Sequence, residues 1–439
     1  MRSRCTFVPP YLLRRIAGAA PEQAQGFTSA LALDEGFRSA RTTMPAQPAP
    51  SIRAGAPWTI HSADHGTTLP GAPVRSTGQP ESGDQAVDEA AYGVAGTLAL
   101  FAEVYGRASF DDAGAPVIAT VHYGQDYVNA FWEGTQLVFG DGDRRVFDRF
   151  TKPVDVLGHE FSHGVVQHTA GLVYQGQPGA LNESVADVFA ACLKQRLLAQ
   201  TPAQADWLIG EGLFLPGVKA RALRDMAAPG TAYDDPVLGV DPQVGHMDDY
   251  VETEDDNGGV HLNSGIPNRA FQLAATSIGH NTWAGAGAIW YAALTSSAVG
   301  PETDFAGFAA ATISAAGDDA DAVSAAWAEV GVSAGAAPSA PIPQAGSTAA
   351  GVVTVRRSGG FVGSTVEGQV DLDGPDDDVV AEVRELVTRI DLAAAASGKA
   401  YPDMYSYVFD LGGTRATVPE QHLTPELRRL ADLLLDRTR

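Results

Sequence analysis

The residues best suited to chemistry lie between Val154 and Asp187. His159 and His163 are four positions apart, so a helix places both imidazoles on one face. Glu160 follows the first histidine, where its carboxylate can take a proton from a water molecule beside a metal. The pattern His-Glu-Phe-Ser-His therefore predicts a zinc site with a general base next to it.

A catalytic zinc ion needs a third protein ligand and one open position. Glu183, in the sequence Asn-Glu-Ser-Val-Ala-Asp, is the candidate for that ligand. Asp187 lies one turn later on the same predicted helix, where it can hydrogen-bond a ligand histidine from behind. The short zinc pattern also occurs in helices that bind no metal, so this second pattern is an independent constraint.

Charge and composition narrow the class of partner. The 439 residues include 29 Lys and Arg against 53 Asp and Glu, a formal net charge of −24, and 45% are hydrophobic. So acidic a chain repels nucleic acid and anionic membrane surfaces, and we expect neither as a partner. No apolar run reaches about 18 residues, so no transmembrane helix is expected. Two distant cysteines, Cys5 and Cys192, predict no disulfide framework.

The first 50 residues are predicted to be a leader with little core of its own. A short amphipathic segment near Pro9 to Ala17 lies within it, and no apolar stretch of the length found in secretory signals is present. We therefore expect synthesis in the cytoplasm without a usual signal peptide, and secretion by another route stays open.

The periodicity of the chain predicts an α+β fold. Short edge strands and loops are expected from residue 51 to 84, and residues 201 to 260 are rich in loops. Residues 252 to 256 are acidic, which fits a solvated loop or a calcium-binding loop. Asn182 is expected near the start of a helix. The predicted helices are Asp84–Tyr105, Val154–Thr169, Gly179–Gln200 and several from Ser264 to Val332, and the predicted strands are 117–124 and the two halves of 128–139.

Residues 334–350 are predicted to be a linker, because Ala, Pro, Gly and Ser dominate them and charge is absent. A small α/β domain is expected over residues 351–439. It comprises two strands around Gly359-Gly360, a helix over 376–396, a hairpin across Gly412-Gly413, and a last helix that Thr424 caps and Pro425 opens.

Four separated motifs together resemble the thermolysin-like neutral metallopeptidases. They are NAFWEGTQLVFGDGD, HEFSH, NESVAD and DNGGVHLNSGIPNRAF, and the resemblance covers about residues 75 to 333. The leader sequence CTFVPPYLL resembles the short propeptide of the protealysin subgroup. The resemblance implies a strand-rich lobe over 51–170 that includes the zinc helix, a mainly helical lobe over 171–333, and a substrate cleft between them.

The resemblance also implies roles for individual residues in a zinc-dependent endopeptidase. His159, His163 and Glu183 match the zinc ligands, Glu160 the general base, and Asp187 the partner of the first histidine. The remaining matches concern the substrate: Asn129 and the backbone of Ala130 hold its main chain, Tyr174 and His261 stabilise the oxyanion, Asp256 orients His261, and Arg224 binds the carbonyl past the cut bond. Separately from these matches, four apolar residues either line an apolar pocket or only pack in the core: Val156, Ile209, Leu213 and Leu223.

One departure from the family concerns calcium. Asp155, Asp206 and Glu211 match part of a calcium site, but Lys194 and Leu208 occupy positions where carboxylates are expected. Because an ammonium group cannot ligate calcium, we expect this site to be absent, with Lys194 paired to Asp155 or Glu211.

Both ends of the chain admit two interpretations. The leader is either a propeptide over the cleft, removed by a cut between about residues 20 and 75, or a tail, and Cys5 could offer a thiolate to the zinc. Residues 351–439 resemble emfourin, an inhibitor of protealysin-like enzymes, and either inhibit the peptidase within or between chains or serve as an accessory domain. The open alternatives for the whole chain are an exopeptidase and a catalytically silent binding protein.

Overall fold

The computed structural model describes residues 6–19, 27, 31 and 57–334, and further on 352–359, 366–372, 378–390, 392, 405–411 and 414–435. Its contacts divide the chain between residues 340 and 341, within the predicted linker, into two compact units. Cys5 and most of the stretch predicted to contain a maturation cut lie outside the described residues. Within the described parts, no helix has both the length and the apolarity needed to cross a bilayer.

A five-stranded sheet forms the first lobe, in the order β2-β1-β3-β5-β4. Strands β1, β3 and β5 run parallel to one another, whereas β2 and β4 pair antiparallel at the two edges. The prediction of edge strands before residue 84 holds for β2 but is wrong for β1, which pairs on both sides. The strands are β1 (Trp58–Ser62), β2 (Ala72–Ser76), β3 (Val117–Val121), β4 (Ala130–Trp132) and β5 (Leu137–Phe139).

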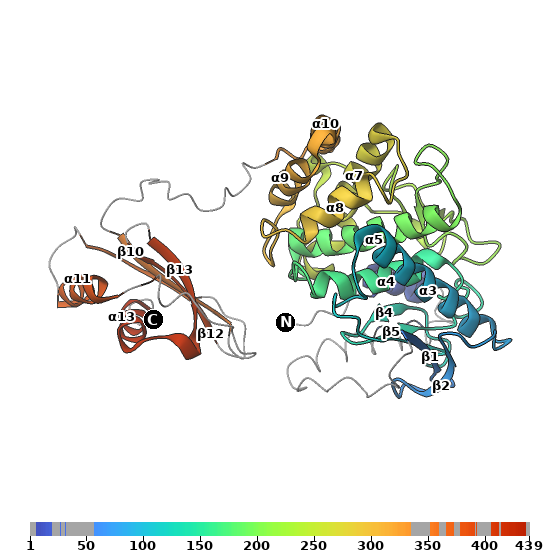
Figure 1. Cartoon of the computed structure of the whole chain (residues 1–439), viewed down its shortest axis with the longest axis horizontal. Helices are drawn as coiled ribbons and strands as arrows, with labels where there is room; N and C mark the ends of the chain where they lie inside the picture. Colours follow the sequence, from blue (N-terminus) through green and yellow to red (C-terminus); the bar gives the residue numbers. More distant parts are fainter. Residues whose placement is uncertain are drawn as a thin grey trace. The chain divides into compact units, whose positions relative to one another are not determined.

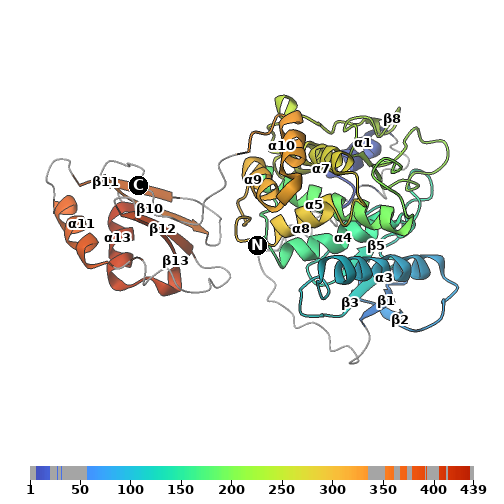
Figure 2. The same cartoon turned by 45° about the horizontal axis from the view of Figure 1, so that its top comes forward.

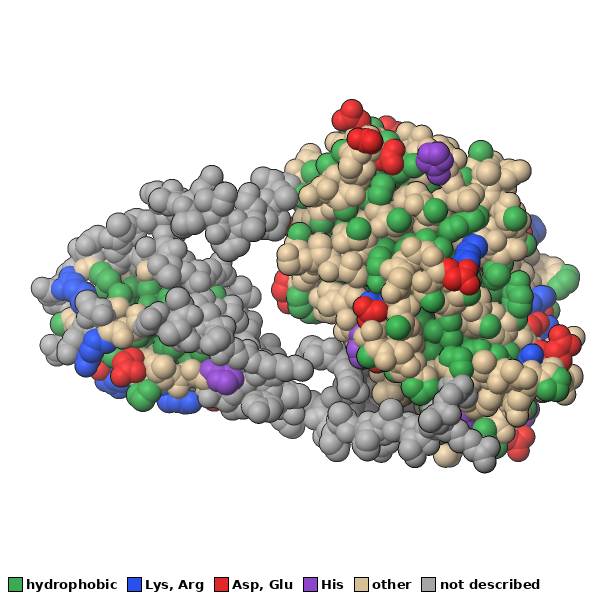
Figure 3. Space-filling view, viewed as in Figure 1, with side chains coloured by type: hydrophobic (Ala, Val, Ile, Leu, Met, Phe, Trp, Pro, Cys, Tyr) green, Lys and Arg blue, Asp and Glu red, His purple; other side chains and the backbone are tan. Residues whose placement is uncertain are grey.

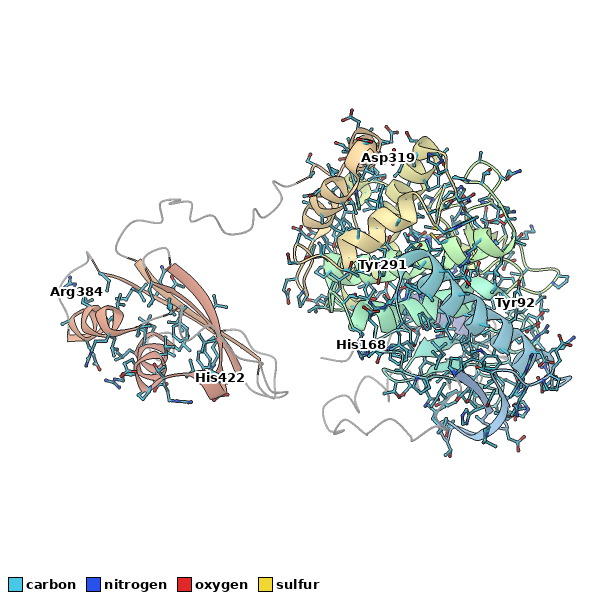
Figure 4. All side chains as sticks on the ribbon, in the orientation of Figure 1. Tyr92, His168, Tyr291, Asp319, Arg384 and His422 are labelled. Carbon is cyan, nitrogen blue, oxygen red and sulfur yellow. The ribbon has the colours of Figure 1, made fainter. Side chains whose placement is uncertain are left out.

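Helix α3 (Gln85–Tyr105) packs on this sheet. The side chain of Asp84 caps it by accepting hydrogen bonds from the first-turn backbone, and Gly106 ends it in a left-handed conformation (φ 66°). Tyr105, in its last turn, stacks on Tyr291 of the helical lobe, with ring centroids 4.7 Å apart. Figure 4 labels Tyr291. The two lobes therefore share one hydrophobic core.

Helices α4 (Val154–Gln167) and α5 (Gly176–Leu197) lie between the sheet and the helices that come later in the first unit, as Figures 1 and 2 show. Both are buried around most of their circumference, which is typical of helices at the centre of a large domain. Helix α5 begins three residues earlier than predicted. Asn182 consequently lies inside the helix, and its predicted position near the helix start is wrong.

The second lobe is mainly helical. Between α5 and the next helix the chain forms only short pieces: β6 (Leu208–Ile209), β7 (Arg224–Asp225), β8 (Asp234–Asp235), β9 (Gly239–Val240) and η3 (Met247–Asp249). The helices that follow are α6 (Asp256–Asn263), α7 (Gly265–Ile278), α8 (Ala286–Leu294), α9 (Phe305–Ala315), η4 (Gly317–Asp319) and α10 (Ala320–Glu329). The predicted two-lobed α+β architecture is thereby confirmed. Acidic side chains are dispersed over the face in Figure 3.

The leader packs into the first unit. Helix α1 (Pro10–Ala19) buries one apolar side, and Phe7, Leu12, Leu13 and Ile16 belong to the same hydrophobic core as the two lobes. Thr6 forms an isolated β-bridge with Phe131 of the edge strand β4. The amphipathic segment predicted near Pro9 is therefore a helix that packs into the core of the first unit.

The second unit has its own core. Its sheet has the order β11-β10-β12-β13, with all neighbours antiparallel. The elements are β10 (Val352–Gly359), β11 (Val366–Asp371), α11 (Asp378–Arg389), β12 (Tyr405–Leu411), β13 (Thr414–Pro419), η5 (Glu420–His422) and α13 (Pro425–Leu435). Leu427 N donates to Thr424 Oγ1 at 3.3 Å, so Thr424 caps the last helix as predicted. Helix α11 ends at Arg389, and most of the predicted helical stretch from there to 396 lies outside the described residues.

Candidate metal centre and active site

The structure brings His159 and His163 of α4 together with Glu183 of α5. The Nε2 atoms of the two histidines are 3.0 Å apart. The Glu183 carboxylate lies 3.5 Å from His159 Nε2 and 3.7 Å from His163 Nε2. All three side chains are buried. Ligands about 2.1 Å from a tetrahedral zinc ion lie about 3.4 Å apart, so this donor set and spacing fit zinc.

The far nitrogen of each histidine has a fixed partner. His159 Nδ1 lies 2.8 Å from Asp187 Oδ1, and His163 Nδ1 lies 2.9 Å from the side-chain oxygen of Asn182. Because both oxygens accept, each Nδ1 carries the proton and each Nε2 keeps its lone pair toward the metal position. The sequence interpretation found Asp187 but missed Asn182, although Asn182 directly precedes Glu183 and α5 turns its side chain toward His163.

Asp187 also anchors Arg224. The guanidinium donates two hydrogen bonds of 2.8 Å to the carboxylate, and Asn268 Nδ2 donates a third at 2.8 Å. Burial by itself raises the pKa of Asp187, but Arg224 and His159 together hold that pKa well below its ordinary range. A fully ionised Asp187 thus links a predicted metal ligand to a predicted substrate-binding residue.

Glu160 is fully buried beside the three candidate ligands. Burial and the negative charge of Glu183 raise the pKa of Glu160 well above its ordinary value. A carboxylate whose proton affinity is raised in this way can accept and later return a proton, as a general base must.

Tyr174 and His261 also lie next to Glu183. The Tyr174 hydroxyl donates to Glu183 and lies 3.4 Å from His261 Nε2. Asp256 Oδ1 lies 2.7 Å from His261 Nδ1. Burial alone would lower the pKa of His261, but Asp256 and Glu183 raise it to about 9, so at neutral pH the imidazole offers N–H groups on both sides.

Leader residues contact the residues that are predicted to hold a substrate main chain. Phe7 N donates to Ala130 O at 3.0 Å, and Val8 N donates to Asn129 Oδ1 at 2.8 Å. Arg224 Nη1 donates to Phe7 O at 3.2 Å. Each residue predicted to hold the substrate main chain therefore contacts the leader.

The Thr6 carbonyl and the Phe7 side chain, which flank the Thr6–Phe7 bond, also contact site residues. Thr6 O lies 3.1 Å from His261 Nε2. The Phe7 ring is fully buried; it lies 4.7 Å from the Arg224 guanidinium carbon and meets the His159 ring edge to face at 5.1 Å. The predicted pocket residues Val156, Ile209, Leu213 and Leu223 are buried in the same core as Phe7.

The region of the family's calcium site is arranged around Lys194. Its ammonium lies 2.9 Å from Asp206 and 2.9 Å from Glu211, and it also donates to Leu208 O at 3.2 Å. Asp155 accepts instead from Gly210 N at 3.1 Å, and burial raises its pKa to about 6. The predicted partner Glu211 is present, but Asp206 takes the place predicted for Asp155.

Comparison with known proteins agrees with this arrangement. Residues 61–167 match the catalytic domain and residues 170–332 the alpha-helical domain of thermolysin metallopeptidases, and residues 355–435 match Emfourin. An extracellular metalloprotease of Pectobacterium carotovorum is 49% identical over 313 residues, which are 70% of this chain and 90% of that protein. Protease PrtS of a Photorhabdus species is 50% identical over 252 residues, or 57% of this chain and 68% of the relative.

Similarity extends to a solved structure. The precursor of protealysin, a metalloproteinase from Serratia proteamaculans, superposes with a TM-score of 0.68 at 46% identity, covering 75% of this chain and 100% of that one. The chain therefore belongs to the thermolysin-like metallopeptidases of the protealysin subgroup, and it carries an emfourin domain after its peptidase.

Proposed function

We propose that this chain is a zinc-dependent endopeptidase that favours an apolar residue after the cut bond, and that its own leader keeps the site closed. The observation that supports this most directly is the run Thr6–Phe7–Val8. The main chain of Phe7 and Val8 is hydrogen-bonded to Ala130, Asn129 and Arg224, and the carbonyl oxygen of Thr6 lies next to His261, as in a bound peptide.

The chain's own residues divide the work of hydrolysis. A zinc ion held by His159, His163 and Glu183 supplies Lewis acidity, which acidifies water and polarises a carbonyl. Glu160 takes the proton of the attacking water and returns it to the leaving amine. His261 and Tyr174 donate hydrogen bonds where negative charge grows on the carbonyl oxygen, and loss of one such donor typically costs about 3 kcal/mol of barrier.

Phe7 supports the proposed preference for an apolar residue. Its ring fills a buried space beside Gly210, where an added Cβ atom would lie 3.3 Å from both the Phe7 ring and the Leu223 side chain. A carboxylate in that space would lose its hydration, and Arg224, the cation beside it, is already paired with Asp187. End-blocked peptides with Leu or Phe after the cut bond should be hydrolysed at least a hundredfold faster than the Asp analogue, a difference of about 3 kcal/mol.

The emfourin domain is proposed to restrain the peptidase within or between chains. It has its own hydrophobic core, so its removal leaves the core of the first unit intact. Deletion of residues 341–439 from the leader-free chain is expected to raise the initial rate at least tenfold, the change that corresponds to ~1.4 kcal/mol. Serial dilution of the full chain separates restraint within one chain from restraint between chains. An unchanged rate and unchanged KM after deletion would assign the domain an accessory role.

Lys194 is proposed to replace the calcium ion of related enzymes. Its ammonium pairs with both Asp206 and Glu211, which are partly exposed, so the change Lys194→Glu should lower the free energy of unfolding by about 2 kcal/mol, less than for a fully buried pair. Added calcium should restore part of that loss, whereas the melting temperature of the unsubstituted chain should not respond to calcium. The exposed Lys152→Glu serves as the control, and strong calcium stabilisation of the unsubstituted chain would contradict the proposal.

Export from the cell is the remaining proposal. A relative from Pectobacterium carotovorum is described as extracellular. We propose that this chain also acts outside the cell. Detection of the processed peptidase only in the cell lysate, and never in the medium, would exclude this.

A further inference from the structure

Three side chains that can bind a metal follow the carboxyl ends of three adjacent strands of the sheet. Because β1, β3 and β5 run parallel, their carboxyl ends lie together. His65 follows the end of β1 at Ser62, His122 directly follows β3, and Asp141 follows the end of β5 at Phe139. The space outside the carboxyl ends of parallel strands is where open sheets commonly bind ligands.

We propose that His65, His122 and Asp141 form a second metal site, for a transition-metal dication such as Zn²⁺. Their candidate ligand atoms all lie within 4.8 Å of one another. His122 Nδ1 is 2.9 Å from Asp141 Oδ2, and His65 Nδ1 is 3.5 Å from the same oxygen. These separations resemble those at the catalytic centre, where the corresponding atoms are 3.0 to 3.7 Å apart.

Asp84 provides the outer support that ligand histidines usually have. Its Oδ2 lies 3.1 Å from His122 Nε2, so that nitrogen donates and Nδ1 points to Asp141. A histidine with a carboxylate at each nitrogen is stable in two states: as a doubly protonated cation, or with a metal cation at one nitrogen. Without a metal, the hydrogen bond to Asp141 and the charges of Asp141 and Asp84 raise the pKa of His122 despite its burial, so a metal that binds at Nδ1 has to displace a proton.

The backbone holds the two histidines in this arrangement. His65 N donates to His122 O at 2.9 Å, and Gly124 N donates to Gly66 O at 2.8 Å. Both histidines have left-handed backbone angles, φ 60° for His65 and φ 54° for His122. Such angles are uncommon outside glycine and cost about 1 kcal/mol or more, and residues that adopt them often serve binding sites.

The chemistry of the ligands selects the metal. Two imidazoles and one carboxylate suit zinc, cobalt, nickel or copper, whereas calcium and magnesium prefer sites made of oxygen atoms alone. The His65 side chain is 45% exposed, which leaves coordination positions open to water. The bound metal would connect the loops after three strands, including the loop at Gly140, whose N–H donates to Asn129 O at 3.0 Å.

Metal stoichiometry tests the proposal independently of peptidase activity. The full chain with Glu160→Gln, which prevents self-digestion, is stripped of metal, titrated with Zn²⁺ and measured by elemental mass spectrometry after gel filtration. We expect two equivalents bound. His65→Asn keeps a side chain that tolerates left-handed backbone, and it should weaken the second equivalent at least tenfold.

Neighbouring positions supply the controls. His61→Asn, on β1 but outside the cluster, is the control and should retain both equivalents. Asp84→Asn tests the support of His122 instead, and it should weaken binding of the second equivalent about tenfold. His65→Asn in the active background should leave peptidase activity unchanged. A single equivalent in the parent chain, or two tight equivalents in His65→Asn, would overturn the proposal and leave His122 as an ion-paired histidine.

Discussion

The intact chain carrying Phe7→Ala is expected to hydrolyse a short blocked peptide about a hundredfold faster than the unsubstituted intact chain. The Phe7 ring is fully buried against Arg224 and His159. Removal of a buried phenylalanine typically costs about 3–5 kcal/mol, and 3 kcal/mol corresponds to more than a hundredfold in a binding equilibrium. The main-chain hydrogen bonds of the leader remain, so the substitution weakens the cover rather than deleting it.

The measurement is an initial rate on freshly purified chain that mass spectrometry shows to be uncut. Arg14→Ala provides the matched control, because Arg14 lies on the exposed side of α1 and should leave the leader in place. An unsubstituted intact chain as active as the leader-free chain would exclude inhibition by the leader. If the intact Phe7→Ala and unsubstituted chains both fail to hydrolyse the peptide while the leader-free chain is active, Phe7 does not keep the leader bound over the site.

Glu160→Gln is expected to lower the turnover of the leader-free chain by about 10³- to 10⁴-fold. A glutamine has nearly the same shape but cannot take a proton from water, and positioned proton transfer contributes up to about 10⁴-fold. Glu160 is buried beside the metal ligands without being one of them, so the metal site should persist. Zinc content and the circular dichroism spectrum should therefore match those of the parent. Turnover within tenfold of the parent would remove Glu160 from the proposed role.

The sequence predicted the parts of the site that depend on local spacing. His159, His163, Glu183 and Asp187 lie on two helices, and helical periodicity alone sets which side chains share a face. The ends of the helices were harder to predict. Helix α5 begins at Gly176 without a capping side chain, so no residue type marked its start, and Asn182 was assigned to a helix end instead of to His163.

Contacts between distant segments could not be predicted from spacing. Arg224 and Asp187 are 37 positions apart, and their paired hydrogen bonds arise because the chain returns to α5 at the short strand β7. The same limit applies to β1, whose interior position depends on pairing with β3. The contact of Lys194 with Asp206 also depends on the path of an irregular loop, which has no periodic pattern.

The structure added most to the prediction for the leader. Its sequence resembled a propeptide, but the resemblance did not say which residues meet the site. The structure places Thr6, Phe7 and Val8 on the residues expected to hold a substrate. The three residues precede α1, whose buried face fixes the leader on the catalytic unit.

The central claim, that this chain is a zinc-dependent endopeptidase, is tested most directly by hydrolysis of a peptide blocked at both ends by the leader-free chain. We predict cleavage at an internal bond that precedes an apolar residue, loss of cleavage with a chelator, and its return when zinc is restored. Cleavage confined to peptides with a free end would indicate an exopeptidase. No cleavage with zinc present would contradict the account and indicate a catalytically silent binding protein.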